Sequence, residues 1–179
     1  MLRETCPGAR IVFDTVDLHY LREERQAAVM DDAVARGTAG ATKRLEIDII
    51  QSCDQTWVVS DHEVGVLAAE TPGVDVKVVS NVIDVPGTEV GFADRSDIVF
   101  IGGYQHPPNV DAVTWFVSEV WPSVRERIPG ARFLIAGSSA PEEVRALGRE
   151  DGVEFLGFVE SAEDFFAGAR ISVAPLRYG

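Results

Sequence analysis

The chain has 179 residues, of which 46% are hydrophobic and 25% charged, a mixture typical of a folded protein with a buried core. Its 29 acidic and 16 basic side chains give a net charge of -13. That charge repels nucleic-acid phosphates and anionic membrane surfaces, so we expect no nucleic-acid partner.

The sequence also lacks the features of membrane, secreted and disulfide-rich proteins. No apolar run approaches the ~20 residues of a membrane helix, and the start lacks the apolar stretch of a signal peptide. We therefore expect a cytoplasmic protein with no integral membrane segment. Cys6 and Cys53 have no C-x-x-C spacing, so we expect reduced thiols and neither a disulfide framework nor a metal site.

The first half of the sequence predicts strands alternating with helices. The expected elements are a strand at 9–14, two helices within 18–52, a strand at 56–60, a helix at 61–70 and a strand at 76–80. Glycine disfavours helix interiors, so we expect the two helices to separate near Gly37 and Gly40. Ser60 and Glu63 have the S-x-x-E spacing of a capped helix start.

The second half repeats this order after an aperiodic linker at 86–96. The expected elements are a strand at 97–101, a helix at 109–127 capped by Asn109, a strand at 132–136, a helix at 141–149, a strand at 153–156, a helix at 162–167 and a strand at 171–174. Strands that alternate with helices form parallel sheets covered by the crossover helices. The sequence therefore predicts an α/β protein with two doubly wound parallel-sheet domains, 1–85 and 97–179.

Each domain has fewer expected strands than the five or six of a usual doubly wound sheet. The chain also begins and ends next to an expected buried strand. We therefore expect a fragment truncated at both ends. Its exposed sheet edges favour self-association.

Ligands of parallel sheets bind at the carboxyl ends of the strands, where four loops of the second domain are candidates. Gly102 and Gly103 would let an anion approach the backbone before a helix start, or would form a tight turn. Gly137 and Ser138 would donate to the same anion, or would only cap the next helix. In the remaining loops, Phe158 and Val159 would contact a planar base or pack in the core, and Arg177 would pair with phosphate.

The first domain offers a second candidate site just after its first strand. Asp14, Asp17 and His19 place two carboxylates and an imidazole together, a combination used in general acid and base chemistry. Two structural alternatives remain open, with Asp17 capping the helix that starts near Leu18 and His19 lying on the surface.

Several segments, in this order, resemble the group 1 glycosyltransferases of the retaining GT-B class, family GT4. They are Ile11–His19, Trp57–Ser60, Val78–Asp84, Val99–Gly103, Pro108–Ala112, Phe133–Gly137, Val153–Val159 and Val173–Arg177. The resemblance covers nearly the whole chain, and the ordered set is more specific than any one segment.

The resemblance implies two Rossmann-like domains and transfer of a sugar from a nucleotide-diphosphate sugar to a glycan or other acceptor, a hexosyltransferase-type reaction without a cofactor. Residues 1–85 resemble the C-terminal part of the acceptor-side domain, and 97–179 resemble the N-terminal part of the donor-binding domain. Asp17 and His19 would be catalytic. The donor-binding residues would be Gly102, Gly103, Gly137, Ser138, Phe158, Val159 and Arg177.

The sequence departs from the family pattern at several points. The Arg and Lys that many members carry after the glycine loop are replaced by Gln105 and His106. The first glutamate of the usual E-x7-E element would fall near Gly179, whereas 175–179 resembles a subset with a P-L-x-x-G stretch. Segment 81–84 resembles an N-G-V-D hinge with valine in place of glycine.

Two other functions remain as alternatives. One is a noncatalytic nucleotide-binding remnant, since a chain without the sugar-contacting segment would have little turnover. Another is a nucleotide-sugar 2-epimerase of the same architecture, although the Pro108–Ala112 pattern favours the transferase. A dehydrogenase is disfavoured because the dinucleotide fingerprint is incomplete after every strand.

Overall fold

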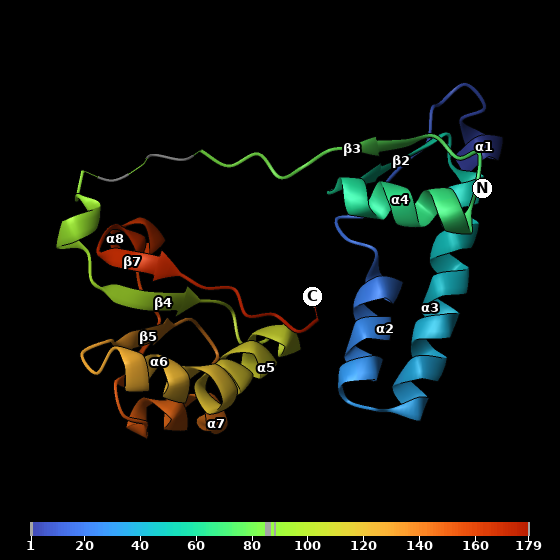
Figure 1. Ribbon diagram of the computed structural model, residues 1–179. Helices are drawn as coiled ribbons and strands as arrows, with labels where there is room; N and C mark the ends of the chain where they lie inside the picture. Colours follow the sequence, from blue (N-terminus) through green and yellow to red (C-terminus); the bar gives the residue numbers. More distant parts are fainter. Residues whose placement is uncertain (1, 85–86, 88, 179) are drawn as a thin grey trace. The chain divides into compact units, whose positions relative to one another are not determined.

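The computed structural model describes residues 2–84, 87 and 89–178 (Figure 1). The chain forms two compact units, the first ending at Asp84 and the second at Arg177. Residues 86 and 88 of the expected linker lie outside the described residues, as do residue 85 of the expected first domain and Gly179 of the P-L-x-x-G stretch. No helix in the described ranges is long and apolar enough to cross a membrane.

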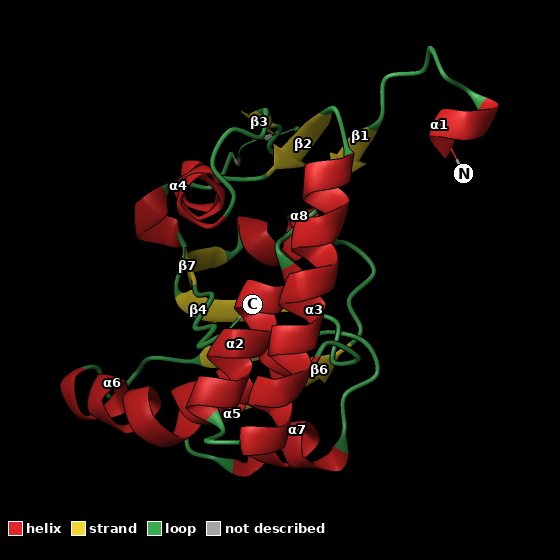
Figure 2. Cartoon of the chain, turned by 90° about the vertical axis from the view of Figure 1, so that its right-hand side faces the viewer, coloured by secondary structure: helices red, strands yellow, loops and turns green. Residues whose placement is uncertain are grey.

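The first unit is a three-stranded parallel sheet with the strand order β1-β2-β3. Its elements are α1 (Leu2–Thr5), β1 (Val12–Asp14), α2 (His19–Val29), α3 (Ala33–Ser52), β2 (Gln55–Val58), α4 (Asp61–Glu70) and β3 (Val76–Val78). Helices α2 and α3 pack side by side (Figure 1 and Figure 2). Leu18, Tyr20, Ile50, Val58 and Leu67 form the buried core.

The break between α2 and α3 corrects the sequence prediction. The chain leaves the helix at Met30 and turns at Asp31, whose φ is 51°, while Gly37 and Gly40 both lie inside α3. The Asp32 side chain accepts hydrogen bonds from the amides of Val34 and Ala35 at 2.8 and 3.1 Å. This cap starts α3 there, and packing of the long helix outweighs the unfavourable propensity of its glycines.

The expected start of α4 is confirmed. Ser60 is the N-cap residue, and its Oγ accepts from the Glu63 amide at 3.4 Å. The Glu63 carboxylate in turn accepts a hydrogen bond from the Val59 amide at 3.0 Å. The S-x-x-E spacing thus satisfies amides at the helix start that have no intrahelical partner.

The second unit is a four-stranded parallel sheet with the order β6-β5-β4-β7. Its elements are a 3₁₀ turn (Phe92–Asp94), β4 (Asp97–Ile101), α5 (Pro107–Trp115), a π-helical turn (Phe116–Val120), α6 (Trp121–Arg127), β5 (Phe133–Ala136), α7 (Glu142–Ala146), a 3₁₀ turn (Leu147–Arg149), β6 (Val153–Gly157), α8 (Ala162–Ala167) and β7 (Ala169–Ser172). Figure 1 shows α8 on one side of this sheet and α5, α6 and α7 on the other. This arrangement is doubly wound, as predicted, and the strand order reverses at β4, which lies between β5 and β7.

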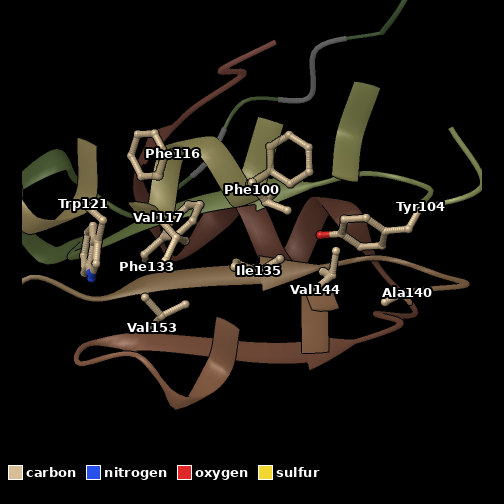
Figure 3. Close-up of a cluster of buried hydrophobic side chains, with 11 residues drawn as sticks. Phe100, Tyr104, Phe116, Val117, Trp121, Phe133, Ile135, Ala140, Val144 and Val153 are labelled. Atoms are coloured by element: carbon tan, nitrogen blue, oxygen red, sulfur yellow. The ribbon is translucent and has the colours of Figure 1, made fainter. Parts of the chain in front are cut away.

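The core of the second unit combines aromatic and aliphatic side chains (Figure 3). The Phe133 ring lies 4.7 Å from the Phe116 ring and 5.6 Å from the Trp121 ring, centroid to centroid. These spacings allow the tilted contacts that aromatic rings prefer. The core therefore fastens the long α5–α6 segment onto β5, next to the loops that follow β4 and β5.

The start and the middle of that helical segment differ from the prediction. The helix begins at Pro107, not at Asn109, and its N-cap residue His106 makes no side-chain cap. Proline suits the first helical turn because the missing N–H has no intrahelical acceptor there. The π-helical turn comes just before Pro122, whose missing amide interrupts regular helical hydrogen bonding.

Candidate functional site

A pocket of about 340 Å³ opens where β4, β5 and β6 end. It is lined by Ile101, Gly102, Gly103, Gly137, Ser138, Phe158 and Val159. The structure thus brings together all of the predicted donor-binding residues except Arg177. Strand ends carry open backbone groups, so the pocket combines amides with one aromatic side chain.

The loops after β4 and β5 are joined by backbone hydrogen bonds. The Gly102 amide donates to the Ala136 carbonyl at 3.2 Å, and the Tyr104 amide donates to the Ser138 carbonyl at 3.0 Å. A Cβ at Gly137 would lie 1.8 Å from the Gly102 carbonyl oxygen, and the φ of Gly137 is 146°. Any side chain at Gly137 would push the loops apart, so this glycine shapes the pocket.

The two glycines after β4 have different surroundings. A Cβ at Gly102 would lie 2.8 Å from Nδ2 of Asn109, whose side chain donates to the Gly103 carbonyl at 2.9 Å. A Cβ at Gly103 would meet no heavy atom within 4 Å. A side chain at 102 would therefore displace the Asn109 amide, whereas position 103 has open space beside the pocket.

The surroundings of Phe158 and Ser138 decide two of the open alternatives. Phe158 is 73% exposed and follows Gly157, whose φ is 72°, so its ring is not part of the core. Ser138 does not cap the next helix, because the N-cap residue of α7 is Pro141. Both residues are therefore available to a ligand in the pocket.

Arg177 lies against α5 and does not line the pocket. Its guanidinium holds the Asp111 carboxylate through two hydrogen bonds, one from Nε to Oδ2 at 2.8 Å and one from Nη2 to Oδ1. The Asp111 side chain is only 8% exposed. This pair ties the segment after β7 to α5, and the predicted contact of Arg177 with phosphate stays a prediction.

In the first unit, Asp17 lies in the loop between β1 and α2, and His19 lies at the start of α2. Asp17 accepts a hydrogen bond from Nη1 of Arg22 at 2.7 Å. The N-cap residue of α2 is Leu18, so the expectation that Asp17 caps this helix is wrong. His19 is the first residue of α2, and its half-exposed imidazole has Nδ1 3.5 Å from Oδ1 of Asp17.

Two buried carboxylates beside this loop were missed by the sequence analysis as site residues. Glu63 accepts from the Leu18 amide at 3.1 Å, and Glu46 accepts from the Tyr20 amide at 2.9 Å. Glu46 shares the buried face of α3 with Ala39 and Ile50, at spacings of seven and four residues. An acidic residue at a helix position otherwise occupied by apolar residues was the sequence signal that could have identified Glu46 as a buried site residue. Within the described residues, no group of three or more His, Cys, Asp or Glu side chains could hold a metal ion.

One family model matches the second part of the chain. The family model described as "Glycosyl transferases group 1" matches residues 95–179. Comparison with the curated proteins gives no match.

Two solved structures of TarM are similar to the chain. One is a TarM variant from S. aureus in complex with fondaparinux, alpha-GlcNAc-glycerol and UDP, with a TM-score of 0.59 and 12% identity. The other is described as TarM, with a TM-score of 0.58 and 12% identity. Each comparison covers 74% of this chain and 27% of the TarM chain, so the chain spans about a quarter of its structural neighbours. At this identity the likeness concerns the fold. The chain from residue 95 onward thus matches the group 1 glycosyltransferase family, as its sequence predicted, and its two parallel sheets resemble the GT-B glycosyltransferase fold.

Proposed function

We propose that this chain is part of a glycosyltransferase that moves a sugar from a nucleotide-diphosphate sugar to an acceptor, with retention at the anomeric carbon. The second unit, predicted as the domain 97–179, binds the donor, and the first unit, predicted as the domain 1–85, contributes to the acceptor side. The observation that carries this proposal is the pocket at the ends of β4, β5 and β6, which gathers six predicted donor-binding residues.

The pocket suits a diphosphate in two respects. Among the described residues, none accepts a hydrogen bond from the amides of Gly103 or Ser138, which leaves both amides for phosphate oxygens. The pocket also lies beside the point where the strand order reverses, which is where open parallel sheets bind ligands. Negative charge develops on the diphosphate as the sugar leaves, and oriented amides stabilise that charge.

The exposed Phe158 ring supports a role in holding the nucleobase. A flat aromatic face gains free energy by stacking on a planar base, and Phe158 is 73% exposed at the pocket. The TarM variant was crystallised with UDP, which makes uridine the first base to test. The transfer moves no electrons to a carrier, so the proposed reaction needs no redox cofactor.

Asp17 and His19 are proposed to act on the acceptor side. A half-exposed imidazole flanked by a carboxylate suits hydrogen bonding to a hydroxyl group and proton transfer. The acceptor is proposed to be a glycan or another hydroxyl-bearing molecule.

Substitution of Gly103 tests the donor site. Gly103→Val places a branched side chain beside the pocket where no protein atom lies within 4 Å, so the fold should persist while UDP binding weakens about tenfold or more. Gly130→Val is the matched control, because a Cβ there also meets nothing within 4 Å and Gly130 lies outside the pocket.

Binding is measured by isothermal titration calorimetry with UDP and GDP as probes. The proposal predicts a loss of affinity in Gly103→Val and unchanged affinity in Gly130→Val. Absence of any nucleotide binding to the unmodified chain would overturn the donor site. Binding of UDP with no sugar transfer from UDP-sugars would favour the noncatalytic alternative.

A further inference from the structure

The start of α2 receives its hydrogen-bond acceptors from other helices. The first amides of a helix have no intrahelical partner, and the N-cap residue Leu18 offers no side-chain oxygen. Glu63 of α4 accepts from the Leu18 amide at 3.1 Å. Glu46 of α3 accepts from the amides of His19 and Tyr20 at 3.2 and 2.9 Å. The two carboxylates therefore hold three consecutive amides in place.

The loop leading into α2 is held in an unusual conformation. Val16 has a φ of 60°, which is a genuine outlier for a β-branched residue. Its amide donates to Oδ1 of Asp14 at 3.2 Å, and the Thr15 hydroxyl donates to the Trp57 carbonyl at 3.0 Å. Such strain persists only where surrounding contacts overdetermine the backbone, and it is concentrated at functional sites.

Glu46 also faces the His19 side chain. Oε1 of Glu46 lies 3.4 Å from Nδ1 of His19, and Oδ1 of Asp17 lies 3.5 Å from the same nitrogen. A carboxylate only accepts hydrogen bonds, so both neighbours favour a proton on Nδ1. The two carboxylates differ in exposure and in partners, since Glu46 accepts from two amides of α2. Asp17 is 31% exposed and pairs with Arg22 at 2.7 Å, whereas the Glu46 side chain is 8% exposed.

We propose that Glu46 is a positioning residue that fixes the Nδ1–H tautomer of His19 and leaves the Nε2 lone pair for a substrate hydroxyl. The second clause rests on the function proposed above, and the first does not. In neutral imidazoles the hydrogen bond made by one ring nitrogen decides which nitrogen stays basic. Glu46 therefore couples the backbone of α2 to the orientation and tautomer of His19.

Nitrogen-15 NMR of the imidazole rings tests the tautomer directly, with assignments from single His→Gln variants. An unconstrained neutral imidazole favours the Nε2–H tautomer, so we expect His19 to deviate from it in the unmodified chain. Glu46→Gln should shift His19 toward Nε2–H while far-UV circular dichroism stays unchanged. His62 is the internal reference for the Nδ1–H tautomer. Its Nε2 lies 3.3 Å from Nη2 of Arg25, and because arginine can only donate, Nε2 of His62 is the acceptor.

Asp17→Asn is the comparison variant, and we expect it to change the His19 tautomer less than Glu46→Gln does. Three results would overturn the proposal. These are an Nε2–H tautomer in the unmodified chain, an unchanged tautomer in folded Glu46→Gln, and a larger change in Asp17→Asn. Where Glu46→Gln does not fold, an Nε2–H tautomer in the unmodified chain or a large change in folded Asp17→Asn still rejects the proposal.

Nucleotide binding separates this inference from the proposed function. Glu46 lies in the first unit, so Glu46→Gln should bind UDP with the affinity of the unmodified chain. If UDP still binds but His19 has the Nε2–H tautomer, only the role of Glu46 is rejected. If His19 has the Nδ1–H tautomer but the chain binds no nucleotide, only the donor site is rejected. Where transfer is measurable, the variant should lower kcat and leave KM for the donor unchanged.

Discussion

Buried polar side chains in this chain differ in whether their hydrogen bonds are satisfied. The Tyr20 hydroxyl is fully buried and has no hydrogen-bond partner in the described part of the chain. The Tyr104 hydroxyl donates to the Ala136 carbonyl at 3.3 Å. Burial, with Glu70 and other carboxylates nearby, raises the pKa of Tyr20 to about 12, so its hydroxyl stays protonated at neutral pH.

The two tyrosines should therefore respond differently to loss of the hydroxyl. Tyr20→Phe removes an unsatisfied group, so we expect an unchanged or higher free energy of unfolding. Tyr104→Phe leaves a buried carbonyl without this donor and should cost about 1 kcal/mol. Urea denaturation at neutral pH measures both values. A greater loss of stability in Tyr20→Phe than in Tyr104→Phe would contradict the hydrogen-bond assignment.

At the scale of single elements, caps decided where helices begin more than propensity did. Residues 18–52 carry helical spacing throughout, and the glycines were the visible breakers. The helix nevertheless runs through Gly37 and Gly40, because Asp32 satisfies the first amides of α3. The start of α4 was predicted because its cap is a local S-x-x-E pattern, whereas α5 begins at Pro107 with no side-chain cap and its start was not predicted.

Two substitutions in α3 test this account. Asp32→Ala removes the cap and should lower the free energy of unfolding by about 1 kcal/mol. Gly37→Ala should raise it by roughly 0.5–1 kcal/mol, since a Cβ there meets no heavy atom within 4 Å and the backbone is helical. Thermal unfolding followed by circular dichroism measures both. Destabilisation by Gly37→Ala would indicate that the chain needs glycine to break the helix, as the sequence first suggested.

At the scale of the whole molecule, two separately cored units expose parts of their sheets. Val12 and Val78 lie on the outer strands of the first sheet and are 37% and 41% exposed. Ile171, on the outer strand β7 of the second sheet, is 48% exposed. Open strand edges with apolar side chains favour pairing between chains, whereas a net charge of -13 opposes close approach.

Salt should therefore change the oligomeric state. Raising the ionic strength from about 10 mM to about 500 mM shortens the Debye length several-fold and screens the repulsion between chains. We expect sedimentation velocity to show larger species at high salt, with the monomer favoured at low salt. A monomer at every salt concentration would argue against the predicted self-association.

Much of the second unit was predictable from local pattern. The strand 97–101 and the helix 162–167 were predicted with the bounds that the structure has, because buried parallel strands and short capped helices carry strong local signals. The strand expected at 171–174 lies at Ala169–Ser172, since hydrogen bonding with β4 sets its register. Apolar spacing alone does not contain that pairing.

The sequence by itself determined the fold class, the family resemblance and the loops that carry the candidate donor site, because parallel strands bring their carboxyl ends to one edge. Only the tertiary structure decided that Gly137 must be glycine, since a Cβ there would collide with the Gly102 carbonyl oxygen of another loop. Only it placed Arg177 on Asp111 and Glu46 beside His19. These contacts join residues far apart in the chain, and a local sequence pattern does not predict which distant side chains will pair.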